Sequence, residues 1–178
     1  MKNKILFALF TIIAFVFAAC EKDDICSAAT PTTPRLIIEF YNQASPEELK
    51  NVSSLALVST EIDVDTLKFA NVTRIQVPLM STQDQTQYHF VLNYQNPNPA
   101  LVFDDLLEFN YTRENIFVSR ACGYKTLFNL NSETDPDVLN PIILNGIPND
   151  ESGEWIKNIV IENANLENET DVHVKIYF

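Results

Sequence analysis

Apolar and polar residues alternate along most of the chain beyond residue 34, and this two-residue period is typical of strands that bury one face. In the last eight residues, DVHVKIYF (171–178), the side chains of Val172, Val174, Ile176 and Phe178 share one side. The segments 53–60, 73–79 and 87–94 repeat the alternation. No amphipathic helix of useful length interrupts these segments, so the pattern predicts an all-β protein.

Strands are predicted where β-branched, aliphatic and aromatic residues cluster: RLIIEFY (35–41), SSLALVST (53–60), TRIQVPL (73–79), QYHFVLNY (87–94), LLEFNY (106–111), NIFVSRA (115–121), YKTLFNL (124–130), WIKNIVIE (155–162) and DVHVKIYF (171–178). A further short apolar segment is PIILNGIP. Two hairpins are expected, one joining 106–111 to 115–121 and one joining 155–162 to 171–178. Gly123 permits a sharp corner, and one helical turn is expected to begin at Ser45 and Pro46.

About eight or nine short strands separated by turn signals predict a β-sandwich with Greek-key or Ig-like connections. Because the chain has only three glycines, its turns must rely on asparagine, aspartate and proline. QNPNP (95–99) and NSETDPD (131–137) are the clearest breaks between strands.

The first residues predict export. Lys2 and Lys4 precede a run from Ile5 to Ala19 that carries no charge, and small residues end it. The run is shorter than the roughly 20 residues that a membrane-spanning helix needs. Residues 1–19 are therefore expected to be a signal peptide, and an uncleaved anchor helix is the alternative.

Phe17-Ala18-Ala19-Cys20 resembles a bacterial lipobox, although Phe17 stands where an aliphatic residue is usual. The resemblance implies that Cys20 is lipidated and becomes the mature N-terminus. Glu21, Lys22, Asp23 and Asp24 resemble the export signal of surface-exposed Bacteroidota lipoproteins; the alternative is a solvated tether. The expected organisation is a signal peptide over 1–19, a lipidated tether and linker over 20–34, and a β-sandwich domain over 35–178. The expected location is the outer membrane, on the cell surface or on the periplasmic face.

Composition makes the expected mature chain acidic. After loss of Lys2 and Lys4 it keeps 10 basic against 24 acidic residues, a net charge of −14. Such a chain is repelled by nucleic acid and by anionic head groups. No nucleic-acid partner is expected.

Three cysteines are present, Cys20, Cys26 and Cys122. With Cys20 acylated, the other two remain in a compartment where disulfides persist. A Cys26–Cys122 disulfide is therefore predicted, and two unpaired buried thiols are the alternative.

Signals for chemistry are weak, so no catalytic residue, metal site or cofactor is predicted. The only histidines, His89 and His173, are expected on strand surfaces, each facing away from its strand's apolar set. Three acidic stretches could supply oxygen ligands to calcium, but none has the glycine placement of an EF-hand loop, and solvated acidic faces are expected instead. Their members are Glu61, Asp63 and Asp65; Glu133, Asp135 and Asp137; and Asp150, Glu151 and Glu154.

The aromatic residues are expected to build the core rather than a ligand-binding face. They are Tyr88, Tyr94, Phe103, Phe109, Tyr111, Phe117, Tyr124, Phe128 and Trp155. Asp65-Thr66-Leu67 resembles an acceptor motif for O-linked glycans on exported Bacteroidota proteins, which makes Thr66 a candidate modification site.

Taken together, CEKDDIC, TPRLIIEFY and FVSRACGYKTLFNL resemble a family of uncharacterised lipoproteins of flavobacterial type in Bacteroidota. The resemblance implies a location in the cell envelope but no activity. A non-enzymatic binding or envelope-interaction module is expected, attached to the lipid bilayer through Cys20, with an envelope protein or a glycan as partner.

Two alternatives remain open. One is a carboxylate-dependent hydrolase acting on envelope or environmental glycans, which needs two carboxylates in one cleft. The other is a fibre subunit with an exposed sheet edge that accepts a donated strand.

Overall fold

The computed structural model describes residues 25–61, 65–130, 140–147 and 153–178. Contacts divide the chain into two compact units. The described part of the small unit comprises residues 25–30 and 117–124, and that of the large unit comprises the other described residues, from Pro31 to Ile116 and from Lys125 to Phe178.

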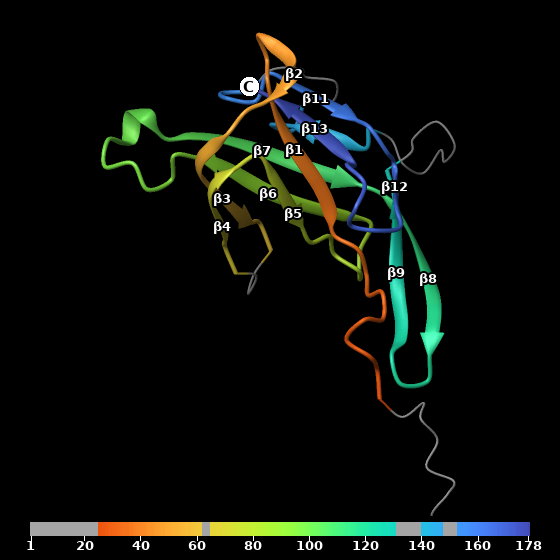
Figure 1. The fold of residues 1–178 in the computed structure, drawn as a ribbon. Helices are drawn as coiled ribbons and strands as arrows, with labels where there is room; N and C mark the ends of the chain where they lie inside the picture. The colour runs from red at the N-terminus through yellow and green to blue at the C-terminus, as the bar shows by residue number, and fades with distance from the viewer. Residues whose placement is uncertain (1–24, 62–64, 131–139, 148–152) are drawn as a thin grey trace, which may run out of the picture. The chain divides into compact units, whose positions relative to one another are not determined.

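The described residues form thirteen strands and one short 3-10 helix, Pro99–Leu101 (Figure 1). One sheet has the order β11-β13-β1-β2, with β5 also paired to β1; its strands are β1 (Leu36–Asn42), β2 (Ser45–Leu49), β5 (Arg74–Val77), β11 (Asn158–Ile161) and β13 (Val174–Tyr177). We call it sheet 1.

Sheet 2 has the order β10-β7-β6-β3-β4, with the strands β3 (Val52–Ser59), β4 (Leu67–Val72), β6 (Gln85–Leu92), β7 (Phe103–Asn110) and β10 (Ile142–Leu144). Sheet 3 has the order β12-β9-β8, with β8 (Thr112–Ser119), β9 (Gly123–Asn129) and β12 (Asn165–Leu166). The ends of β8 and β9 that flank their connecting turn belong to the small unit.

The hydrophobic core of the large unit joins its sheets. Phe40 of β1 contributes from sheet 1, and Leu57 and Phe90 of β3 and β6 contribute from sheet 2; all three are fully buried. Phe128 of β9 and Leu166 of β12 belong to the same core. The predicted all-β sandwich is confirmed. β6 and β7 bury alternate residues, as the sequence pattern requires, whereas β1 buries the three consecutive residues 36–38 and is therefore covered on both faces.

The strand count exceeds the predicted eight or nine because several strands lack an apolar alternation. β2 consists of SPEEL and is almost wholly exposed. The helical turn predicted there is wrong, since Leu49 and Ser45 pair with Tyr41 and Asn42 of β1. β4 precedes the predicted strand 73–79, and the chain passes at Thr73 from sheet 2 into sheet 1.

One predicted hairpin is confirmed and one is wrong. β11 and β13 pair antiparallel, with Ile159 opposite Ile176. The hairpin of 106–111 with 115–121 does not form, because β7 pairs with β6 and β10 whereas β8 pairs with β9. Between β7 and β8, the buried Tyr111 donates its hydroxyl proton to the Met80 carbonyl at 2.9 Å, and burial raises the pKa of Tyr111 to about 12. The expected turn, Thr112 to Glu114, is the start of β8.

A buried carboxylate links the two main sheets. Asp105 of β7 is fully buried, and its oxygens accept hydrogen bonds from the backbone N–H groups of Glu154, Trp155 and Ile156 at 2.6, 2.9 and 2.9 Å. The side-chain amide of Asn145 donates a fourth bond at 2.8 Å. Several N–H donors on one carboxylate offset the cost of burying its charge.

Replacement of Asp105 by alanine should destabilise the fold strongly, because four buried or half-buried donors would lose their acceptor. We expect a loss of about 3 kcal/mol or more in the free energy of unfolding. Urea titration followed by circular dichroism measures it. Asp104→Ala removes the neighbouring, half-exposed carboxylate and should cost less than about 1 kcal/mol. Equal losses in the two variants would contradict the role given to Asp105.

Candidate functional site

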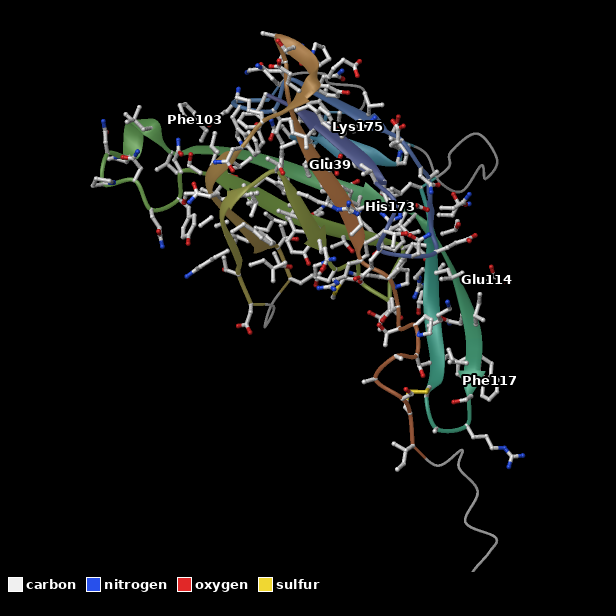
Figure 2. All side chains as sticks on the ribbon, viewed as in Figure 1. Glu39, Phe103, Glu114, Phe117, His173 and Lys175 are labelled. Atoms are coloured by element: carbon white, nitrogen blue, oxygen red, sulfur yellow. A yellow bond between two sulfur atoms is a disulfide. The ribbon has the colours of Figure 1, made fainter. Side chains whose placement is uncertain are left out.

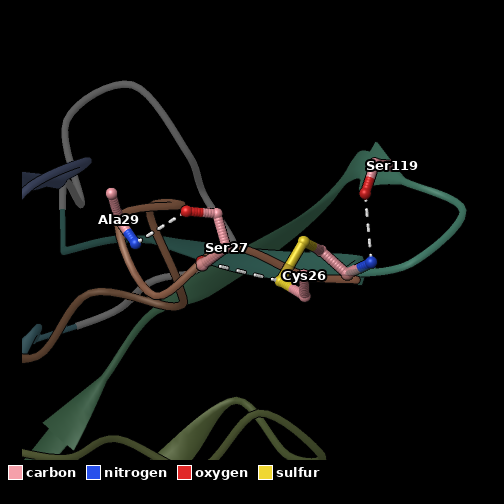
Figure 3. The surroundings of a disulfide bond; sticks show 5 residues. Cys26, Ser27, Ala29 and Ser119 are labelled. Carbon is pink, nitrogen blue, oxygen red and sulfur yellow. Dashed lines mark hydrogen bonds between the residues drawn. A yellow bond between two sulfur atoms is a disulfide. The ribbon is translucent and has the colours of Figure 1, made fainter. Parts of the chain in front are cut away.

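The residues of the predicted lipid anchor and export signal, Cys20 and Glu21 to Asp24, lie outside the described residues. These two assignments stay predictions. The predicted disulfide between Cys26 and Cys122 is present in the small unit (Figure 3). Thr66 is exposed immediately before β4, so its hydroxyl is accessible, and its modification stays a prediction.

The two histidines differ from each other. His89 lies on the surface as predicted, with its Nδ1 3.0 Å from Asp104 Oδ2. The prediction for His173 is wrong, because this residue is fully buried in the large unit (Figure 2). Its ring Nδ1 accepts a hydrogen bond from Ile37 N–H at 2.9 Å, and the backbone N–H of His173 donates to the Ile37 carbonyl at 3.0 Å. Burial lowers the pKa of His173, and the accepting Nδ1 requires the neutral ring.

The acidic stretches are only partly described. Glu61, Asp65 and Glu154 lie within the described residues, whereas the other members lie outside them: Asp63, Glu133, Asp135, Asp137, Asp150 and Glu151. Within the described ranges, no group of three or more His, Cys, Asp or Glu residues could hold a metal ion. Glu154 instead accepts a hydrogen bond from Asp104 N–H at 3.1 Å.

Most of the aromatic residues build the core, as predicted, but Tyr94, Phe117 and Tyr124 do not. The buried ones are Tyr88, Phe109, Tyr111, Phe128 and Trp155. Tyr94 and Phe103 are half-buried. Phe117 and Tyr124 are 55% and 70% exposed, so the core interpretation is wrong for these two residues.

A cleft of about 500 Å³ opens in the large unit beside β4 and β5, a size within the range of about 300–1,000 Å³ for ligand pockets. We call it the β4–β5 cleft. Its lining residues are Arg35, Leu67, Phe69, Arg74, Ile75, Gln76 and Pro78.

The register of the two sheets explains why the walls of this cleft are apolar. Leu67 and Phe69 of β4 stand opposite the fully buried Leu57 and Leu55 of β3, so they belong to the core face of sheet 2. Ile75 of β5 stands opposite the buried Ile38 of β1, on the core face of sheet 1. Since Leu67 and Phe69 lie on an edge strand, they are only partly covered. The cleft is therefore the open flank of the sandwich.

Two guanidinium groups border the cleft. Arg35 makes a two-pronged ion pair with Glu169, with Nε–Oε1 and Nη2–Oε2 distances of 2.7 and 2.8 Å. These bonds lower the pKa of Glu169 and keep it ionised. Arg74 Nη2 donates to the Thr170 carbonyl at 2.8 Å, and its Nη1 lies 3.7 Å from Glu39. The pairs hold both cations at the cleft in an otherwise acidic protein.

The strands beside the cleft have open edges. In the part of the chain that the structure describes, β4 pairs only with β3 and β5 only with β1. Phe40 N–H donates to the Thr73 carbonyl, so these two residues form a hydrogen-bonded pair of the antiparallel β1–β5 ladder. Because hydrogen-bonded and non-hydrogen-bonded pairs alternate in an antiparallel ladder, the N–H and C=O groups of Arg74 and Gln76 point away from β1. Such an edge can pair with an added strand.

A second cleft contains two carboxylates, which the hydrolase alternative requires. Glu114 and Glu167 line it together with Thr112, Arg113, Leu127, Phe128, Asn129 and Asn165. Its volume of about 160 Å³ is well below the roughly 300 Å³ at which ordinary ligand pockets begin. It offers little room to enclose a sugar ring between two acids, so the geometry favours the β4–β5 cleft.

Sequence reasoning missed the β4–β5 cleft, since LKFANV carries too weak an alternation to be recognised as a strand. It also missed Asp105, although a signal was present. In FDDLLEFN this aspartate shares the phase of the buried Leu107 and Phe109, which is unusual for a charged residue.

A family model described as a family of unknown function (DUF6452) matches residues 54–178. No curated protein and no solved structure matches the chain. A search of the described residues for a helix of sufficient length and hydropathy to cross a bilayer finds none.

The buried His173 should make stability depend on pH. Its pKa is lowered in the folded state, so the unfolded chain binds the proton more readily as the pH falls below about 6.5. We therefore expect the free energy of unfolding to decrease between pH 7.5 and 5.5, and urea titrations across this range measure it. Nearby, Asp171 raises this pKa and Arg74 lowers it further.

A matched pair of variants isolates this effect. His173→Asn keeps an acceptor for Ile37 N–H but cannot titrate, so its pH dependence should be flatter than that of the parent. Thr126→Val, at a buried polar residue that does not titrate, is the control and should keep the parent slope. An unchanged slope in His173→Asn would contradict the assignment.

Proposed function

The chain belongs to the family of unknown function (DUF6452), which supplies no activity, and we propose that it is a lipid-anchored binding protein of the bacterial envelope. In this proposal Cys20 carries the lipid and attaches the protein to the outer membrane of a Bacteroidota cell. The large unit binds an extended segment of another envelope protein in the β4–β5 cleft. The function is non-enzymatic.

The sequence supports the anchor. Lys2 and Lys4, the apolar run that follows and the Ala-Ala-Cys ending together resemble a lipoprotein signal. Each buried methylene of an acyl chain contributes about 0.8 kcal/mol, so several chains would hold a domain of this size at a bilayer. Export to the cell surface is supported in the same way, by the resemblance of Glu21 to Asp24 to a lipoprotein export signal.

One observation carries the binding role: an open strand edge borders an apolar cleft of ligand-pocket size. A strand added beside β5 would pair with the outward N–H and C=O groups of Arg74 and Gln76. Alternate side chains of the added strand would then reach Leu67, Phe69 and Ile75, which line the cleft. A glycan has no peptide backbone, so it could not form a β-ladder with the outward N–H and C=O groups of β5.

The proposed anchor requires a lipid modification at Cys20. Mass spectrometry of the protein purified from its native membranes should find Cys20 as the first residue, with diacylglycerol on its sulfur. The variant Cys20→Ser should keep residues 1–19, because processing depends on the lipidated cysteine. A free Cys20 thiol behind an intact leader would contradict the proposal.

The cleft predicts where a partner can be cross-linked. With p-benzoylphenylalanine at Phe69, irradiation of whole cells should give a discrete adduct to one short segment of an envelope protein. The same group at the exposed Leu101 is the control and should give no such adduct. Equal adducts from both positions, or adducts only with glycan, would contradict binding of a protein segment in this cleft.

A change in the backbone tests the added strand directly. Gln76→Pro removes the outward N–H without removing a bond to β1, whereas Gln76→Ala keeps it. Loss of one hydrogen bond of about 1 kcal/mol should lower adduct yield at Phe69 about fivefold in the proline variant relative to the alanine variant. Circular dichroism checks that both variants fold. Equal yields from two folded variants would show that no main-chain ladder forms there.

A further inference from the structure

The small unit exposes apolar side chains beside its disulfide. Phe117 and Tyr124 flank the β8–β9 turn with 55% and 70% of their surfaces exposed, and Ile25 is 84% exposed. Figure 2 labels Phe117 on β8. The two rings contact each other edge to face, with centroids 5.4 Å apart. Exposed aromatic rings that find no place in a core are unusual in a soluble domain and often mark an interaction surface.

The disulfide fixes this turn to the residues just behind the anchor. Cys26 bonds to Cys122 within the turn, and Cys122 N–H donates to Ser119 Oγ at 3.0 Å, which closes the turn (Figure 3). Six residue steps separate Cys26 from Cys20, and a fully extended chain of that length spans at most about 20 Å. The aromatic turn therefore cannot move far from residue 20, whatever path the intervening residues take.

The described residues of the small unit lack the negative charge that the rest of the chain carries, and negative charge disfavours contact with a membrane surface. The described residues of the small unit contain no aspartate or glutamate, in a chain with 24 acidic residues, and their single charged group is the exposed Arg120. An arginine beside Tyr and Phe can contact lipid phosphates while the rings enter the boundary between head groups and acyl chains. The acidic tether residues Asp23 and Asp24 favour zwitterionic over anionic lipid.

We propose that the β8–β9 turn is a second membrane contact, in which Phe117, Tyr124 and Ile25 insert into the interface of the bilayer that holds the lipidated Cys20. This inference rests on the proposed anchor. The anchor supplies a high local concentration of bilayer, so the turn needs only weak affinity of its own to stay bound. The Cys26–Cys122 bond then acts as a clamp that limits how far the turn can move from the membrane.

Quenching of tryptophan fluorescence by brominated lipid tests the contact. The acylated protein is purified from membranes and reconstituted in vesicles of phosphatidylcholine, with and without bromine on the acyl chains. Phe117→Trp adds an emitter at the turn, Tyr124→Trp adds one at the second ring, and Leu101→Trp is the exposed control in the large unit. The native Trp155 is buried and supplies a constant background.

We expect brominated lipid to remove most of the added emission in Phe117→Trp and Tyr124→Trp and little of it in Leu101→Trp. Mass spectrometry of the same preparations reports whether Cys20 is acylated. Acylated protein with no quenching at either ring position would overturn the second contact while leaving the anchor in place. Equal quenching at all three positions would also overturn it, because the turn would not be the part that inserts. An unmodified Cys20 would overturn the anchor and this inference together.

Discussion

The buried carboxylate of Asp105 is the interaction on which the sandwich depends. It sits on β7 of sheet 2 and binds the backbone of residues 154–156, which lead into β11 of sheet 1. This bond set places Trp155, whose indole donates to the Phe90 carbonyl at 2.8 Å and whose ring packs on Phe40. A β-carbon at residue 153 would overlap the Asp105 carboxylate, so glycine is required there. One buried side chain thus connects β7 of sheet 2 to the segment that leads into β11 of sheet 1.

The open flank follows from how the chain changes sheets. At Thr73 it leaves sheet 2 after β4 and joins sheet 1 as β5, next to β1. Both strands therefore have an edge without a described partner, and the inner-face residues Leu67 and Phe69 stay partly uncovered. Soluble proteins usually protect such edges against chance pairing. An uncovered edge beside an apolar cleft supports a binding role, whereas the cleft lined by Glu114 and Glu167 offers little room for a sugar ring between the two acids.

The sequence predicted what depends on local pattern and failed where distant parts of the chain decide. Alternation located β3, β6 and β13, and a run of aliphatic and aromatic residues located β1. Pairing partners were harder: β7 and β8 are neighbours in sequence but join different sheets. His173 followed the polar phase of its strand, yet its bonds to Ile37 take it into the interior. The cleft could not be predicted, since an edge is defined by the strands that do not pair with it. The Cys26–Cys122 pairing could be predicted from the number of cysteines and from the expected export of the chain.

In the proposed function, the outer edge of β5 receives a strand from a partner in the envelope. Hydrogen–deuterium exchange resolved to single amides of β1 and β5 tests this pairing, in the purified protein and in the same protein on isolated native envelopes. We expect the outward amides of Arg74 and Gln76 to exchange rapidly in the purified protein and slowly on envelopes, while the amides of β1 are protected in both preparations. Equally rapid exchange of the β5 amides in both preparations would contradict it.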